Sequence, residues 1–155
     1  MTMNKIILIF VTIIIIIAAG AAFFASRSSG LLGTKAEATI GEEKFSLNVA
    51  DTPEKRQKGL SNTRSLGDKN GMLFVFDEPT IPAFWMKEMN FPIDIIFLNN
   101  ERVITVFPNV QAPKEENDPL PTYQPISPSN RVIEVKAGTV ERLKIVPGNE
   151  IQVSL

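Results

Sequence analysis

The sequence predicts a mainly β protein: a small antiparallel β-barrel or sandwich-like domain with one short helix, preceded by an N-terminal transmembrane helix. The first observation behind this prediction is the stretch 71–100, in which short apolar runs rich in Phe, Ile and Val are separated by Pro, Asp and Asn. Such runs are typical of strands and are too short for helices. We expect three of them to form a meander at the centre of the domain, at residues 72–76, 83–86 and 93–98.

The second observation is that similar short runs recur on both sides of this stretch. Residues 36–40 and 44–49 are expected to form a β-hairpin. In the second run Phe45, Leu47 and Val49 alternate with polar residues, which indicates a strand with one buried face. The expected total is roughly eight short strands, a number typical of a barrel or sandwich.

The third observation is the N-terminal segment. The run that begins at Ile6 and ends at Phe24 is uncharged and almost wholly apolar, and about 20 such residues can cross a bilayer as a helix. We expect residues 1–25 to be a single-pass anchor in the cell membrane, residues 26–35 a flexible linker, and residues 36–155 the β domain. A short tail before the span predicts that this domain is extracytoplasmic. The alternative is a cleaved signal peptide, although its apolar run would normally be shorter.

A single clear helix is expected after the hairpin. Pro53 fits a first helical turn, where its missing N–H is not needed, and either Asp51 or Thr52 can cap the free backbone N–H groups. If Asp51 is the cap, Glu54 completes a capping box. The helix would run to about Leu60, with a solvated face of Lys55, Arg56 and Lys58.

Turn and strand signals continue to the end of the chain. Asn99 and Asn100 tolerate positive φ and predict a tight turn. The segments after it are a strand at 102–107 ended by Pro108, an irregular Pro-rich loop at 111–130, a strand at 131–135, a turn or short helix at 138–145, and a closing strand at 151–153.

Composition restricts the possible functions. The chain has 16 Lys and Arg against 17 Asp and Glu, so we expect no basic face and no nucleic-acid partner. It has no Cys and no His, which excludes disulfides, thiol chemistry, imidazole bases and the commonest zinc ligands. The acids at 115–118 lack the Gly-containing loop of a calcium site, so neither a metal nor a cofactor is expected.

Several sequence blocks follow one another through the domain. They are residues 50–54 continuing through Arg56 to 59–60, then Arg64, 71–76, 84–87, 92–94 with Phe97, 134–135 with 137–138, and Gly148. In this combination residues 36–155 resemble domain-of-unknown-function family 192. The resemblance implies a compact β-barrel or sandwich-like domain, often exported or membrane-anchored, with no established activity. Many members have Cys in the segment equivalent to 111–128, which this chain lacks, so no disulfide or metal role is carried over.

Five residues are candidates for a binding site. The family pattern marks all of them, and a Lys and an Asp among apolar strand residues are costly to bury unless paired. A Trp beside a charged group can bind a sugar ring or a small anion. We therefore predict a non-catalytic module that binds a small molecule, a sugar or an envelope protein through Arg64, Trp85, Met86, Lys87 and Asp94.

Three alternatives remain open. The first is structural: Asp94 accepts backbone N–H bonds at the 90–92 corner, or pairs with Arg64 or Lys87. The second is a hydrolase that uses Asp94 with Lys87 or Arg64, with Glu88 or Glu134 as the second acid that glycoside hydrolysis requires. The third is an accessory envelope protein that contacts a partner through a sheet edge or the Pro-rich loop.

Overall fold

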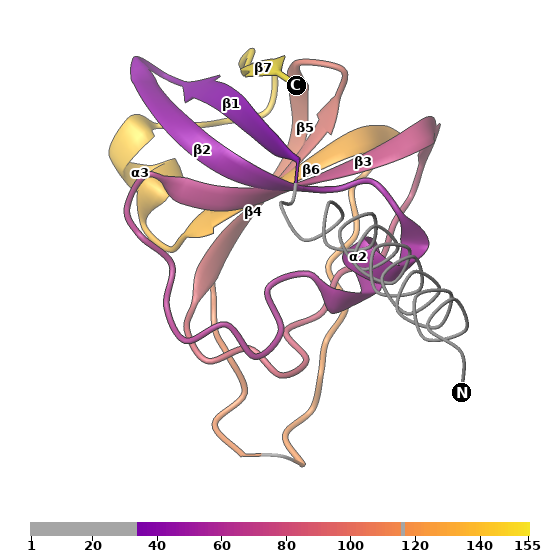
Figure 1. Ribbon diagram of the computed structural model, residues 1–155, viewed down its shortest axis with the longest axis vertical. Coiled ribbons are helices and arrows are strands. Elements are labelled where there is room, and N and C mark those ends of the chain that lie inside the picture. The colour runs from indigo at the N-terminus through magenta and orange to yellow at the C-terminus, as the bar shows by residue number, and fades with distance from the viewer. Residues whose placement is uncertain (1–33, 116) are drawn as a thin grey trace, which may run out of the picture. The chain divides into compact units, whose positions relative to one another are not determined.

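A computed structural model describes residues 34–115 and 117–155, and Thr34–Leu155 form one compact unit. A single curled sheet of seven strands dominates this unit, with the strand order β5-β4-β6-β3-β2-β1-β7 (Figure 1). The elements are β1 (Lys35–Ile40), β2 (Glu43–Ala50), α2 (Pro53–Lys58), β3 (Asn70–Thr80), β4 (Ile93–Asn99), β5 (Arg102–Val110), β6 (Ser129–Lys136), α3 (Thr139–Leu143) and β7 (Gln152–Ser154).

The predicted membrane anchor, from Ile6 to Phe24, and most of the predicted linker lie outside the described residues. Within the part of the chain that the structure describes, no helix has both the length and the apolar composition needed to cross a bilayer.

The local predictions in the first third of the domain are confirmed. β1 and β2 pair as an antiparallel hairpin, and α2 follows directly. Thr52 is the N-cap of α2, because its Oγ1 accepts a hydrogen bond from the Lys55 N–H at 3.3 Å. Gly59, with φ of 48°, ends the helix before the expected Leu60.

The strand pairing of the sheet corrects the antiparallel prediction. After α2 the chain runs back through residues 59–69 and enters β3 parallel to β2, which makes the sheet mixed. Within residues 34–155, as far as they are described, seven strands and two short helices replace the roughly eight strands and one clear helix that were expected. The second helix, α3, lies within the segment 138–145, where the sequence predicts a turn or short helix.

The predicted meander at 71–100 is wrong in its order. β6 lies between β3 and β4 and pairs antiparallel with both, so the two strands never touch as neighbours. Residues 83–86 are not a strand; they belong to the irregular connection from β3 to β4, which makes only an isolated bridge between Phe84 and Tyr123. Local apolar runs report burial but carry no information on which later strand will insert between them.

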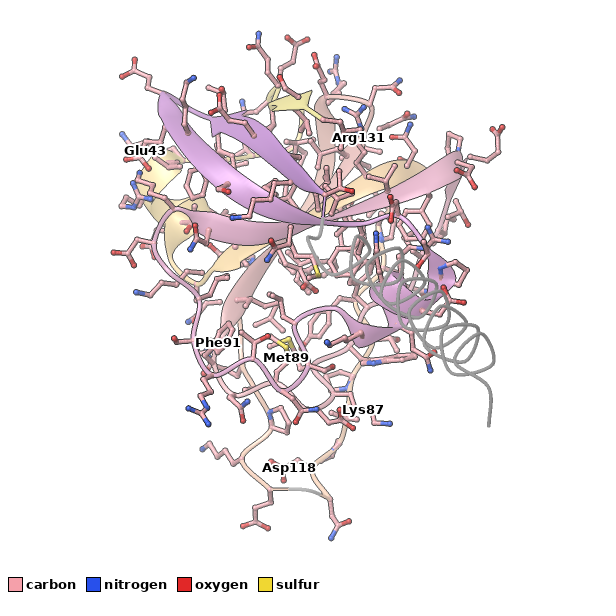
Figure 2. All side chains as sticks on the ribbon, viewed as in Figure 1. Glu43, Lys87, Met89, Phe91, Asp118 and Arg131 are labelled. Atoms are coloured by element: carbon pink, nitrogen blue, oxygen red, sulfur yellow. The ribbon has the colours of Figure 1, made fainter. Side chains whose placement is uncertain are left out.

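The two edges of the sheet meet at one end. The Val103 N–H donates to the Asn149 carbonyl at 2.9 Å, and the Gly148 N–H donates to the Val103 carbonyl at 2.8 Å. These bonds join the start of β5 to the segment that leads into β7, and they curl the sheet toward a barrel. At the opposite end the Pro-rich loop projects away from the sheet, with Asp118 near its tip (Figure 2).

The central strands are buried on both faces, so the domain has two apolar clusters. One face carries Leu73, Ile96, Leu98, Ile133 and Val135 against the β1–β2 hairpin and α3. The other carries Phe74, Ile95, Phe97 and Val132, together with Leu60, Met86 and Met89 from the connections.

Strand alternation separates the two acids of these central strands. Asp94 is registered with Val135, and Glu134 with Ile95, so the two carboxyl groups point to opposite faces of the sheet.

Gly71 in β3 is required by close backbone packing. A Cβ at this position would collide with the Glu134 carbonyl oxygen and lie 2.7 Å from Leu47 Cδ2. We predict that Gly71→Ala lowers the free energy of unfolding by about 1–3 kcal/mol or more, because backbone atoms cannot move aside cheaply. Urea unfolding of the full chain measures it. Gly67→Ala is the control, since its nearest neighbour is the adaptable Asn70 side chain; equal effects of both variants would contradict the prediction.

Candidate functional site

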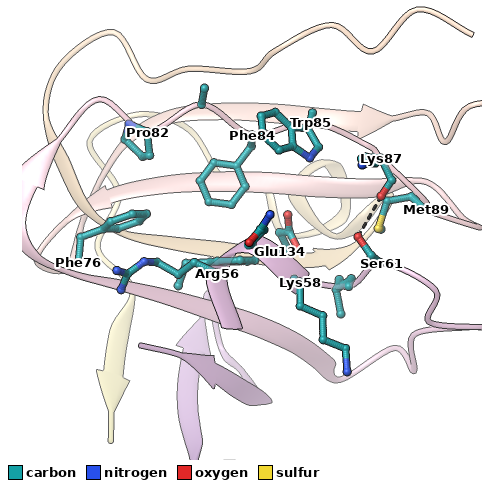
Figure 3. A pocket seen from close by; sticks show the side chains of 15 residues that line it. Arg56, Lys58, Ser61, Phe76, Pro82, Phe84, Trp85, Lys87, Met89 and Glu134 are labelled. Carbon is teal, nitrogen blue, oxygen red and sulfur yellow. Dashed lines mark hydrogen bonds between the residues drawn. The ribbon is translucent and has the colours of Figure 1, made fainter. Parts of the chain in front are cut away.

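A pocket of about 330 Å³ opens between α2 and the connection from β3 to β4 (Figure 3). Its floor is the face of the sheet that carries Glu134 and Phe74. The residues that line it come from three segments: Arg56–Ser61 on α2 and the turn after it, Phe74 and Phe76 on β3 with Glu134 on β6, and Pro82–Trp85 with Lys87 and Met89 on the connection.

Glu134 is the distinctive group of this pocket. Its side chain is almost fully buried, and its Oε2 atom has no hydrogen-bond partner among the described residues. Its direct neighbours on the adjacent strands, Met72 and Ile95, are apolar. Burial away from water raises the pKa of the Glu134 carboxyl to about 8 from 4.5. Buried polar groups nearly always have a partner, and among the described residues this oxygen and the Ser129 Oγ are the exceptions, so Glu134 is a candidate contact for a ligand.

Aromatic side chains form the walls. The Phe84 ring packs edge-on against Phe74 and Phe97, with centroid distances of 4.8 and 5.5 Å. Two backbone hydrogen bonds with Tyr123, at 3.0 and 2.8 Å, hold Phe84 in place although it lies in no strand. The next residue, Trp85, is 50% exposed at the mouth of the pocket and offers a free ring face.

Basic side chains surround the opening. Arg56 is fixed, because its Nη1 donates to the carbonyl oxygens of Asp51 at 2.9 Å and Val75 at 2.8 Å. Its guanidinium also lies 5.0 Å from the centre of the Phe76 ring, a cation–π contact. Lys58 and Lys87 are exposed and also line the pocket.

The structure brings together only part of the predicted site. Trp85 and Lys87 line the pocket, whereas the side chain of Met86, 2% exposed, belongs to the apolar core of that face and lines a neighbouring hollow beside Tyr123. Arg64 is exposed and does not line this pocket. Asp94 is on the opposite face of the sheet.

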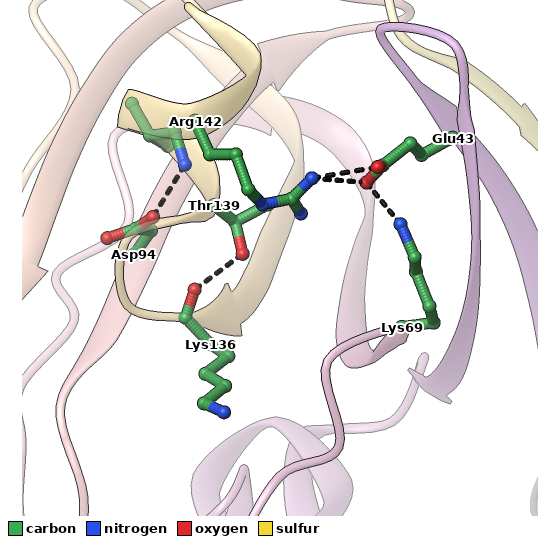
Figure 4. A network of polar contacts seen from close by, with 7 residues as sticks. Glu43, Lys69, Asp94, Lys136, Thr139 and Arg142 are labelled. Atoms are coloured by element: carbon green, nitrogen blue, oxygen red, sulfur yellow. Dashed lines mark hydrogen bonds and ion pairs between the residues drawn. The ribbon is translucent and has the colours of Figure 1, made fainter.

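Asp94 organises the backbone at the end of β4. Its Oδ1 accepts from the Asn109 N–H at 2.7 Å and the Gly138 N–H at 3.3 Å. Its Oδ2 accepts from the Val140 N–H at 2.7 Å, and Figure 4 shows one of these bonds of Asp94. These donors lie on β5 and around α3, not at the expected 90–92 corner. Among the described residues Asp94 pairs with neither Arg64 nor Lys87, which corrects that part of the structural alternative.

A salt-bridge cluster lies beside the Asp94 network. Glu43 at the start of β2 accepts from Arg142 of α3 at 2.7 Å and pairs with Lys69, so it joins the hairpin, α3 and the β3 entry (Figure 4). These two bases hold the pKa of the Glu43 carboxyl below its usual value. Each acid and base here has a protein partner, so the cluster resembles a structural clamp more than a ligand site.

Two residues of the pocket have a role that sequence reasoning missed. Glu134 was expected only as a second acid in the hydrolase alternative; its signal is a single Glu inside an apolar strand, as clear as the signal of Asp94. Arg56 was assigned to a solvated helix face, and nothing in the local pattern distinguishes it from Lys55 and Lys58. Arg56 reaches the pocket because β3 packs beside α2 in the folded domain, where the Val75 carbonyl accepts its hydrogen bond.

The fold and the pocket define a small β domain with a candidate ligand site. The chain belongs to the DUF192 family, described as "Uncharacterized ACR", whose profile matches residues 23–153.

Two crystal structures have a similar fold. One, a protein of unknown function from Novosphingobium aromaticivorans, is 28% identical, with a TM-score of 0.65 over 77% of this chain and 84% of that one. The other, described as a "putative transcription regulator" from Sinorhizobium meliloti, is 25% identical, with a TM-score of 0.65 over 77% of this chain and 92% of that one. A search of curated proteins gave no match.

The Asp94 network generates a stability prediction. Asp94→Ala should lower the free energy of unfolding by about 3 kcal/mol or more, because it leaves three backbone N–H groups without an acceptor. Asp94→Asn keeps one acceptor oxygen and should cost less. Chemical denaturation measures both, with Asp68→Ala as the control because that acid is exposed. An Asp94→Ala variant as stable as the control would show that the network does not stabilise the fold.

The raised pKa of Glu134 generates a pH prediction. The unfolded carboxyl titrates near 4.5 and the folded one near 8, so the stability associated with its neutral form is complete below pH 4.5 and is lost as the pH rises to 8. In that window the free energy of unfolding of the wild type should fall by up to about 1.4 kcal/mol per pH unit relative to that of Glu134→Gln, whose amide does not titrate. Urea unfolding of both proteins at pH 5, 7 and 9 measures the difference. A constant difference would contradict the raised pKa.

Proposed function

We propose that this protein is a membrane-anchored, extracytoplasmic module that binds a small molecule, such as a sugar derivative, in the pocket between α2 and the β3–β4 connection. The observation that carries the proposal is the unpartnered Oε2 of Glu134 on the pocket floor. A ligand hydroxyl, amide or acid group that reaches this atom would supply the missing hydrogen bond.

The size and lining of the pocket support this proposal. Its volume of about 330 Å³ lies at the lower end of the range usual for small-molecule sites. Apolar residues, four of them aromatic, form most of its lining, and six polar or charged residues complete it, a composition compatible with a small-molecule site. The exposed ring of Trp85 provides a flat surface on which a sugar or aromatic ring can stack.

Binding is favoured over hydrolysis by the number of acids. Among the described residues that line the pocket, Glu134 is the one carboxylic acid, whereas glycoside hydrolysis usually requires two that flank the scissile bond. Asp94, the acid of the hydrolase alternative, faces the other side of the sheet and already accepts three hydrogen bonds.

The proposed location rests on the sequence. The apolar run from Ile6 to Phe24 has the length and composition of a membrane span. We propose that this span anchors the chain and places the domain on the extracytoplasmic side, where envelope sugars and envelope proteins are the available partners.

The binding proposal is tested with Trp85, which is the only Trp of the chain. The full chain in detergent micelles is titrated with envelope sugars, sugar acids, peptides and nucleotides, and both Trp fluorescence and thermal unfolding are recorded. We expect at least one compound to shift both signals. Glu134→Leu removes the polar side-chain atoms of the pocket floor, so it should lower the affinity for that compound at least about 10-fold.

The matched control is Glu141→Leu, an exposed acid on α3 that does not line the pocket. It should bind as the wild type does. Unchanged affinity in Glu134→Leu would place the site elsewhere, and capture of an envelope protein with no small-molecule response would favour the accessory-protein alternative.

A further inference from the structure

The charges around the pocket restrict what it can bind. We infer that the pocket selects a ring-bearing oxyanion: a small molecule in which a carboxylate or phosphate is attached to a sugar or aromatic ring. This inference rests on the proposed function, because it concerns the occupant of the same pocket.

Among the described residues three bases line the pocket, and Glu134 is its one acid. From α2 come Arg56 and Lys58, and from the β3–β4 connection comes Lys87. The neighbouring strands β3 and β4 present apolar side chains, Met72 and Ile95.

Two acids of the described part of the chain lie near the rim without lining the pocket, because Glu54 and Glu88 line the adjoining hollow that shares Lys58 and Lys87 with it. Glu88 Oε1 is 4.0 Å from Lys87 Nζ, and both side chains are at least half exposed, so solvent weakens this pair. With Glu134 neutral, the three bases of the pocket still outnumber these two acids, which favours an anion over a cation.

Arg56 is prepared to bind an oxyanion. Its Nη1 is occupied by two backbone carbonyls, which fixes the plane of the guanidinium. Among the described residues no hydrogen bond uses its Nε or Nη2, so these donors remain for a ligand. A fixed guanidinium edge with free N–H groups matches the geometry of a carboxylate or phosphate.

Glu134 complements an anion when it is protonated. A neutral carboxyl is a hydrogen-bond donor, and an O–H group that donates to an oxyanion forms a strong, charge-assisted bond. The burial that raises the pKa of Glu134 to about 8 keeps it neutral at pH 7. Once ionised, the same group would repel the ligand, so binding should weaken as the pH rises.

The inference is tested with probes that share a ring and differ in charge. The full chain is titrated at pH 7 with glucuronate, glucose 6-phosphate, glucose and glucosamine, and with benzoate, benzyl alcohol and benzylamine, with Trp85 fluorescence as the readout. In at least one series the acid should bind at least about 10-fold more tightly than the neutral and amino compounds. Glucuronate and glucose 6-phosphate distinguish carboxylate from phosphate selectivity.

Charge variants locate the effect. Lys58→Gln should lower the affinity for the acidic probe several-fold and leave the affinity for the neutral probe unchanged. Lys144→Gln is the matched control, because Lys144 is exposed and lines none of the pockets described here.

The pH dependence tests the role of Glu134 itself. If only the neutral acid binds, the affinity of the wild type for the acidic probe should fall about 30-fold between pH 7 and pH 9.5, in proportion to the neutral fraction. Glu134→Gln should retain binding, because its amide still donates, and should lose most of this pH dependence. A merely structural role of Glu134 would change affinity equally for probes of every charge.

Two outcomes overturn the inference in distinguishable ways. If neutral or amino compounds bind as tightly as the acids, or if affinity rises with pH, the charge selectivity is wrong while the pocket remains a ligand site. If no probe changes the Trp85 signal, and no library compound is sensitive to Glu134→Leu, both the inference and the proposed function fail.

Discussion

The two-sided burial of β4 and β6 is the constraint on which the rest of this structure depends. Each strand lies between two others and is covered on both faces, and every residue from Ile93 to Leu98 is buried. In such strands a polar side chain has no solvent to rely on and must find a partner within the protein or from outside. Asp94 and Glu134 are the two carboxyl groups placed under this condition, and alternation directs them to opposite faces.

The two acids meet the condition in different ways. Asp94 accepts three backbone N–H groups that have no other use, and in doing so it fixes the end of β5 and the start of α3. The Asp94 carboxylate therefore has a structural role. Glu134 has an oxygen with no protein partner, beside a space of about 330 Å³ that a small molecule can enter. A buried carboxyl thus has a structural role on one face, where Asp94 lies, and is a candidate ligand contact on the other, where Glu134 lies.

Sequence reasoning succeeds here where the physical signal is local. The β1–β2 hairpin, the start of α2 and the Asn99–Asn100 turn each depend on alternation, capping or φ tolerance within a few residues, and each is found. The parallel pairing of β2 with β3 and the insertion of β6 depend on contacts between segments far apart in the chain, which no local pattern encodes.

The candidate site shows the same division. Trp85 and Lys87 are predicted from the family pattern and from a charge beside an aromatic ring, and both line the pocket. Asp94 is predicted from the same family pattern and lies on the other face. Arg56 could not be found, because its position over the pocket exists only once α2 has packed beside β3.

The energetic cost of Glu134 is the strongest argument that the pocket serves recognition. Its neighbours on the same face, Met72, Ile95 and Val132, are apolar, and an apolar residue of similar size at position 134 would pack there without leaving an orphaned oxygen. With a pKa near 8, the carboxyl opposes folding increasingly above pH 4.5, whereas an apolar residue would not. A group that lowers stability where a simpler one would raise it is typical of functional sites. Since a ligand that binds only the folded state adds stability by mass action, an occupant that bonds to Glu134 would recover part of this cost.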